Sequence, residues 1–123
     1  MMYIFVMVLN KTEFLDKILD KFTELGVTGG TLIDSTGMAK TILCDDKLPT
    51  VGGLSSIFDY CRPNNKTMFS IIENNEMLQK VQNVIQGEVC DFNEPGVGIS
   101  FAIPIENVVG LPDENIIYNN KSN

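Results

Sequence analysis

Two halves of this 123-residue chain carry the same pattern, and this repeat constrains the fold more than any other feature. Residues 13–18 (EFLDKI) align with residues 76–81 (EMLQKV), 63 positions later. The same separation aligns the apolar residues 5–9 with residues 68–72. In each half, an apolar run typical of a buried strand precedes an amphipathic run with helical spacing. Two such units in one domain predict a split βαβ arrangement.

The first half shows its elements in order. Residues 3–9 are predicted to form a buried strand, and a helix with a continuous apolar stripe follows. That stripe consists of Phe14, Leu15, Ile18, Leu19, Phe22 and Leu25. Asn10 and Glu13 have the spacing of a capping box, and Gly26 is placed to end the helix. A second strand is predicted over residues 27–34.

The second half repeats this order. A third strand is predicted over residues 67–72, and a helix begins at Asn74 or Asn75 and stops near Gly87. The last strand is predicted over residues 98–109. Because Pro104 lacks a backbone donor, this strand is expected at an edge of the sheet or bent at that residue.

The fold class is therefore α+β, a ferredoxin-like βαββαβ sandwich with an antiparallel sheet and a long loop between strands two and three. Residues 1–110 are expected to form this domain, and residues 111–123 a polar tail. Both helices would cover one face of the sheet. The strands are apolar enough that the other face must also be buried, so oligomerisation is expected.

Charge and composition exclude several function classes. Nine basic and sixteen acidic residues give a net charge of −7, which disfavours binding to nucleic acid or anionic lipid. The chain has no histidine, so imidazole bases and histidine-ligated metals are absent, and we predict that it is not an enzyme. Its three cysteines form no CxxC pair, and its apolar start is too short to span a membrane. A cytoplasmic protein is expected.

The insertion between the two halves, residues 35–66, is too long to be a simple connection. It is rich in glycine, proline and asparagine, and loops of this length are usually functional. We predict that its apolar residues bind a partner protein, namely Leu54, Ile57, Phe58 and Tyr60. The alternative is a short helix that completes the core.

The string Gly26-Val-Thr-Gly-Gly-Thr31, with Gly37 after it, resembles the nitrogen-regulatory P-II signalling proteins and their wider superfamily. The plan of two βαβ units around a long loop is similar as well. The resemblance implies a cytosolic homotrimer that binds adenine nucleotides in clefts between subunits. It also implies that the long loop, the T-loop of that family, contacts a regulated protein such as a transporter or an enzyme.

The resemblance also implies where the ligand binds. Thr31 matches the adenine-contacting threonine of the family. The other implied ligand residues lie at the base of the long loop and in a second loop before the last strand: Thr36, Gly37, Met38 and Lys40, and Pro95, Gly96, Val97 and Gly98. The family carries a lysine in that second loop, whereas residues 88–98 hold three acidic residues and no basic one. We therefore expect an uncharged or weakly anionic ligand, or a nucleotide bridged by a divalent cation.

One alternative belongs to another class. The CutA-type divalent-cation tolerance proteins share this topology and are trimeric, and a protein resembling them would bind metal ions. Metal ions alone would then shift the thermal stability, and removing Asp45, Asp46 or the loop cysteines Cys44 and Cys61 would abolish that shift. No spacing among these residues defines a shared site.

Overall fold

The computed structural model describes residues 1–38 and 64–111. The strands are β1 (Met2–Leu9), β2 (Thr31–Ser35), β3 (Asn65–Ile72) and β4 (Gly98–Ile105). The helices are α1 (Leu15–Glu24), after a 3-10 turn at Thr12–Phe14, and α3 (Asn75–Val84), which continues into a π-helical turn at Ile85–Val89.

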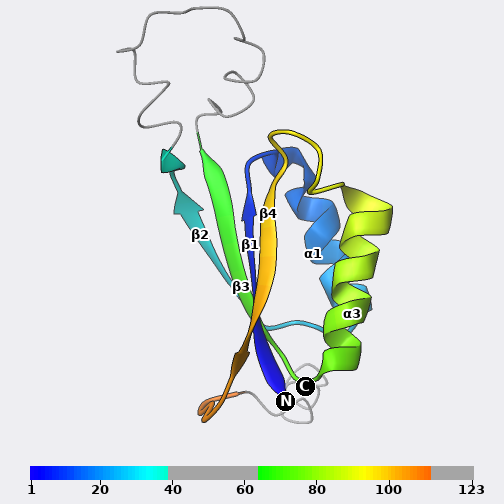
Figure 1. The fold of residues 1–123 in the computed structure, drawn as a ribbon, viewed down its shortest axis with the longest axis vertical. Coiled ribbons are helices and arrows are strands. Elements are labelled where there is room, and N and C mark those ends of the chain that lie inside the picture. Colours follow the sequence, from blue (N-terminus) through cyan, green and yellow to red (C-terminus); the bar gives the residue numbers. More distant parts are fainter. Residues whose placement is uncertain (39–63, 112–123) are drawn as a thin grey trace, which may run out of the picture.

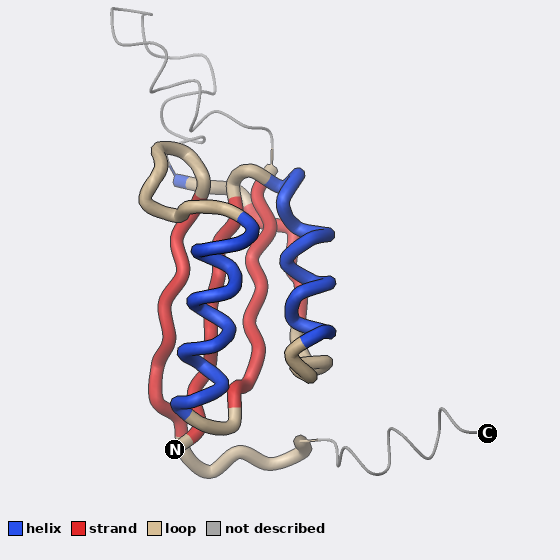
Figure 2. The backbone as a smooth tube through the Cα atoms, turned by 90° about the vertical axis from the view of Figure 1, so that its right-hand side faces the viewer, coloured by secondary structure: helices blue, strands red, loops and turns tan. Residues whose placement is uncertain are grey.

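The described strands form one antiparallel sheet in the order β2-β3-β1-β4. Both helices pack on the same face of this sheet, as Figures 1 and 2 show. This is the predicted ferredoxin-like arrangement. The central strands are the two that begin the repeated units, β1 and β3, and β2 and β4 are the edges. Pro104 accordingly lies on an edge strand, as expected.

The hydrophobic core follows the 63-residue repeat. On β1 the buried side chains are Phe5, Met7 and Leu9, and on β3 the residues 63 positions later, Met68, Ser70 and Ile72, are buried as well, besides Asn65 at the start of the strand. The helices behave in the same way, since Ile18 and Val81 are both fully buried and Phe22 and Ile85 are nearly so. The repeat in the sequence is therefore a repeat of core positions on equivalent elements.

The start of β2 and the end of β4 differ from the predictions, because each strand extends only as far as its neighbour pairs with it. β2 begins at Thr31 rather than residue 27, because its pairing with β3 starts at the Thr31–Phe69 pair. β4 ends at Ile105 rather than residue 109, because its neighbour β1 begins at Met2, directly opposite. Ser35, Asn65 and Lys66, which were expected in the long loop, belong to β2 and β3.

The predicted capping box at Asn10 is wrong. α1 begins at Leu15, and neither it nor the 3-10 turn before it has a side-chain cap. Asn10 instead accepts a hydrogen bond from the side-chain amide of Asn65, at 3.2 Å. The prediction for α3 is confirmed, because the Asn74 side chain accepts from the backbone N–H of Met77 at 2.8 Å.

Gly26 ends the first helix as predicted, with a Schellman motif. Its φ is +85°, its N–H donates to the carbonyl of Thr23 at 3.0 Å, and the N–H of Val27 donates to Phe22 at 2.8 Å. This turn sets the direction in which residues 27–30 leave the helix and run to β2.

Replacing Gly26 with alanine should lower the free energy of unfolding by about 1–2 kcal/mol, because an L-residue is strained at this left-handed φ. A Cβ at Gly26 would meet nothing within 4 Å, so the cost is conformational only. Urea unfolding followed by circular dichroism measures the change. Gly87→Ala is the control, since a Cβ there is equally free and φ is not positive. Equal midpoints for the two variants would contradict the prediction.

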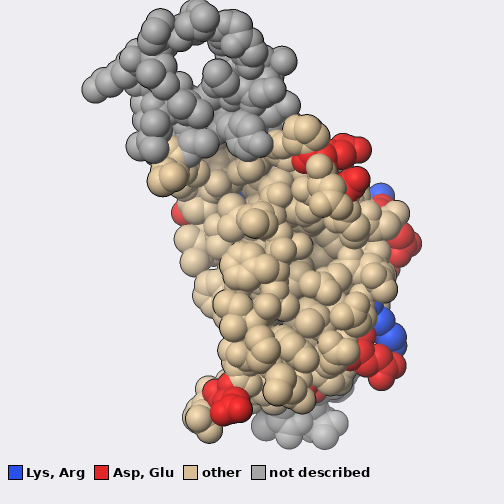
Figure 3. All heavy atoms as spheres, viewed as in Figure 1, with Lys and Arg blue, Asp and Glu red and all other residues tan. Residues whose placement is uncertain are grey.

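The face of the sheet turned away from the helices is apolar and open. The cross-strand pairs place on it alternate residues of every strand: Ile4, Val6, Val8, Ile33, Phe69, Ile71, Ile99, Phe101 and Ile103. On the edge strand β4, Ile99, Phe101 and Ile103 are 58%, 41% and 48% exposed. Charged side chains in Figure 3 gather along the helix side and the lower end, and the middle of the view is almost free of them.

Candidate functional site

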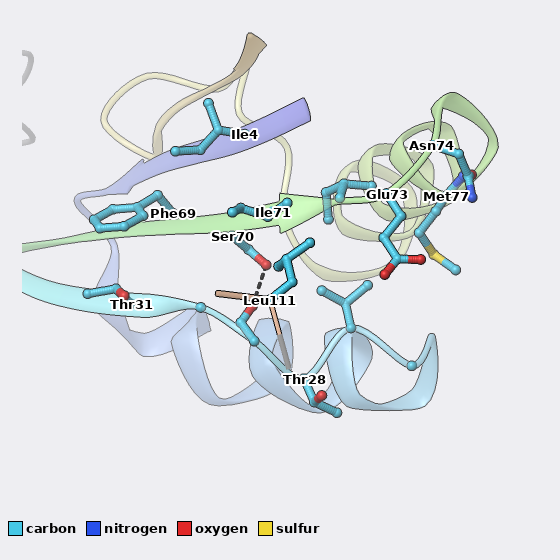
Figure 4. Close-up of a pocket in the computed structure, with 15 residues that line it drawn as sticks. Ile4, Thr28, Thr31, Phe69, Ser70, Ile71, Glu73, Asn74, Met77 and Leu111 are labelled. Carbon is cyan, nitrogen blue, oxygen red and sulfur yellow. Dashed lines mark hydrogen bonds between the residues drawn. The ribbon is translucent and has the colours of Figure 1, made fainter. Parts of the chain in front are cut away.

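A cavity of about 450 Å³ lies at the end of the sheet where β3 passes into α3. Its walls come from residues 26–31, from the end of β3 with Glu73, Asn74 and Met77, and from Ile4 and Leu111 (Figure 4). The lining is mainly apolar, and Glu73 is its one charged side chain among the described residues. Such a site suits a flat or apolar ligand group held by a few polar contacts.

The wall formed by residues 26–31 is held tightly against β3. The buried hydroxyl of Ser70 donates a hydrogen bond to the carbonyl oxygen of Gly29, the dashed line in Figure 4. At Gly30, a Cβ would come within 3.3 Å of the carbonyl oxygen of Phe69 and 3.5 Å of the Ser70 Cβ. Gly30 therefore allows the close approach that shapes the cavity, whereas a Cβ at Gly29 would meet nothing within 4 Å.

Thr31 is the predicted ligand residue that lines this cavity, at the start of β2. Sequence reasoning missed Phe69, Ile71, Met77 and Leu111 as lining residues. The alternation of β3 offered a signal for two of them, because Phe69 and Ile71 lie on the opposite face from the core residues Met68 and Ile72.

Thr36, Gly37 and Met38 lie at the other end of β2. Thr36 lines a separate groove of about 650 Å³ with residues of β2, β3 and the chain after β1. Met38 is 76% exposed there. Lys66, which also lines the groove, pairs with Asp34. Lys40 lies outside the described residues.

A polar network fixes the two ends from which the long loop departs. Asn65, which is 7% exposed, accepts a hydrogen bond from the Ser35 hydroxyl and donates to Asn10. The Ser35 and Thr67 hydroxyls are 2.7 Å apart. The network therefore holds the end of β2 beside the start of β3, so the loop begins and ends on a rigid base.

The second predicted ligand loop precedes β4, at the far edge of the sheet from β2. Pro95 is exposed, Gly96 is buried with φ +76°, and Val97 is 1% exposed in the core. The carbonyl of Val97 accepts from the N–H of Asn10 at 2.9 Å. Gly98 pairs with Leu9 on β1, so β1 and β3 separate this loop from β2. A single chain therefore does not bring together those predicted ligand residues that the structure describes.

Residues 86–93, which precede this loop, are joined by hydrogen bonds among themselves. The Asp91 carboxylate accepts from the Gln86 side-chain amide and, at 2.9 Å, from the N–H of Asn93. Gln86 in turn accepts from the N–H of Phe92 at 3.1 Å. The carboxylate of Asp91 is therefore already engaged by the turn that it stabilises.

Cys90 is a core residue with an unreactive thiol. It is 8% exposed, and burial raises its pKa, as does the negative charge of Asp91 to a smaller extent. The thiol therefore stays protonated at neutral pH and is a poor nucleophile.

Residues 1–38 and 64–111 contain no group of three or more His, Cys, Asp or Glu side chains arranged to hold a metal ion. The acidic pair and the loop cysteines of the metal-binding alternative lie outside these ranges. So do the predicted partner-binding residues Leu54, Ile57, Phe58 and Tyr60. In the same described ranges, no helix has the length and apolar character needed to cross a membrane.

Comparison with known proteins supports the fold. No known protein family and no curated protein matches the sequence. Among solved structures, the chain is similar to the PII protein of Arabidopsis thaliana bound to citrate, with a TM-score of 0.59 and 17% sequence identity. The match covers 89% of this chain and 80% of the Arabidopsis chain. The protein therefore has a PII-like fold.

Proposed function

We propose that this chain is a cytoplasmic P-II-like regulatory protein, a homotrimer that senses a small ligand in the clefts between subunits. Its long loop would contact a regulated protein such as a transporter or an enzyme. The observation that carries the proposal is the apolar cavity beside the edge strand β2, with Thr31 in its wall, on a fold similar to that of a PII protein.

Assembly would bring the divided ligand residues together. Thr31 and residues 36–38 lie along or next to one free edge of the sheet, β2, and residues 95–98 lead into the other free edge, β4. Placing the β2 edge of one copy near the β4 edge of the next would put both sets on the same cleft. The open apolar face, which a monomer leaves in water, supports such an assembly.

The charges at the cavity and at the loop before β4 favour a ligand with few phosphate groups. Glu73 lines the cavity and Glu88, Asp91 and Glu94 surround the second loop. Of the described lysines, Lys11 lines the same pocket as Glu88, Asp91 and Glu94, Lys66 pairs with Asp34, and Lys21 pairs with Glu24 and Glu88. A free triphosphate would meet mainly carboxylates here. We therefore propose an adenine-type ring with little negative charge, or a nucleotide whose phosphates are bridged by a divalent cation.

Isothermal titration with adenosine, cyclic AMP, AMP, ADP and ATP, with and without Mg²⁺, tests this proposal. We expect the less charged compounds to bind without Mg²⁺ and ATP to bind only with it. Thr31→Val should weaken binding by about 5- to 10-fold, the value of one hydrogen bond. Thr23→Val is the matched control, because that hydroxyl bonds the Leu19 carbonyl within α1. Absence of binding for every adenine compound would refute the nucleotide-sensor function.

A further inference from the structure

We infer that the cavity beside β2 is a docking site for the C-terminal segment of the same chain, residues Ile116–Tyr118. The proposal uses the cavity that the proposed function assigns to a ligand, so tail and ligand would compete for it. The proposal rests on where the described chain ends, on the part of β3 at the cavity that β2 does not pair with, and on the chemistry of residues 112–123.

The described part of the chain ends at the cavity. Leu111, the last described residue before the C-terminus, is one of the residues that line the cavity. It is 39% exposed. Figure 4 draws it between the strand that carries Ile71 and the segment that carries Thr28. Residue 112 is therefore joined to a residue in the wall of the cavity.

The cavity also lies beside the part of β3 that β2 does not pair with. β2 pairs with β3 from Asn65 only as far as Phe69, whereas β3 continues to Ile72. Ser70, Ile71 and Ile72 thus extend beyond the last β2 pair, and all three line the cavity. A strand end with apolar neighbours is a favourable surface for a short extended segment.

The remaining twelve residues contain one suitable occupant. Residues 112–123 read PDENIIYNNKSN, in which Ile116, Ile117 and Tyr118 form a single apolar cluster among polar residues. β-branched and aromatic residues are the types that favour strands. Ile117 is six positions after Leu111, and an extended chain of that length spans about 20 Å. The cluster can therefore reach the cavity from the point where the tail begins.

The test is a methyl NMR comparison of the full-length protein with a variant carrying Ile116→Ser, Ile117→Ser and Tyr118→Ser. We expect the Ile4 and Ile71 methyl resonances to shift when the Tyr118 ring and the two isoleucines are removed. Ile18, fully buried in the core on α1, should not shift and reports that the variant is folded. Asn119→Ser with Asn120→Ser is the control, because it changes the same tail without removing apolar groups. Unchanged Ile4 and Ile71 resonances would overturn the proposal.

A second measurement identifies which chain supplies the tail. Isotope-labelled chains of the triple variant are refolded together with unlabelled native chains. The labelled Ile71 methyl should keep its variant position, because its own tail is defective. A return toward the native position would show that a neighbouring copy supplies the segment and would overturn the assignment to the same chain. No ligand is present in either experiment, so this proposal and the nucleotide-sensor proposal can fail separately.

Discussion

Gly98→Ala should leave little folded protein, the largest effect expected from any single methyl group in the described chain. A Cβ at Gly98 would lie 2.2 Å from the carbonyl oxygen of Val8 and 3.1 Å from the Cα of Leu9. Both are backbone atoms of the central strand β1 and cannot move away as a side chain would. The φ of +149° adds strain that L-residues rarely tolerate. We expect a loss of roughly 3–5 kcal/mol, a large part of the stability of a small domain.

Circular dichroism during urea unfolding measures this loss. Gly37→Ala is the control, because it lies among the predicted ligand residues but its Cβ would meet Asn65 at an ordinary 3.5 Å. It should retain a cooperative transition near that of the native protein. Similar unfolding midpoints for the two variants would contradict the structural role of Gly98. Loss of ligand binding in Gly98→Ala would follow from unfolding alone, so this variant does not test whether Gly98 contacts the ligand.

The fold was predictable from sequence because the pattern that defines each repeated unit lies within a short stretch of the chain. Each strand–helix unit carries its own periodicity, and aligning the units 63 residues apart matches Ile18 with Val81, both fully buried. Helix ends set by neighbouring residues were also predictable, as at Gly26 and Asn74. The capping prediction at Asn10 failed because a distant residue, Asn65, binds its side chain instead.

The cavity was only partly predictable because it depends on pairing between distant segments. Thr31 was identified through a family resemblance, whereas Phe69 and Ile71 join it only through the register of β2 against β3. Leu111 comes from beyond the expected domain end at residue 110, and no local pattern places it in the wall of the same cavity as Ile4. Periodicity predicts which face of a strand is apolar, but it does not predict where a neighbouring strand stops and leaves that face open.

Phe101→Asp should convert the proposed trimer into monomers. Phe101 lies opposite Val6, and Val6 lies opposite Phe69, so its side chain lies on the open face, midway along the edge strand β4. Phe101 is 41% exposed in the single chain. An aspartate at this position can therefore remain hydrated, and we expect the monomer to stay folded. In an assembly that buries this face, the same carboxylate would lose its water without a partner, which costs several kcal/mol at each of the equivalent positions.

Light scattering coupled to gel filtration, at matched micromolar concentration, measures the mass. The native protein should elute at three times the chain mass and Phe101→Asp at one. Asn83→Asp is the matched control, because it adds the same charge at an exposed position of α3 and should leave the trimer intact. A native monomer would refute the trimer, and an unchanged mass for Phe101→Asp would exclude the open face as its interface. If dissociation also abolishes binding of the adenine compound while the chain remains folded, the ligand site requires two subunits, as the separation of β2 from the loop before β4 predicts.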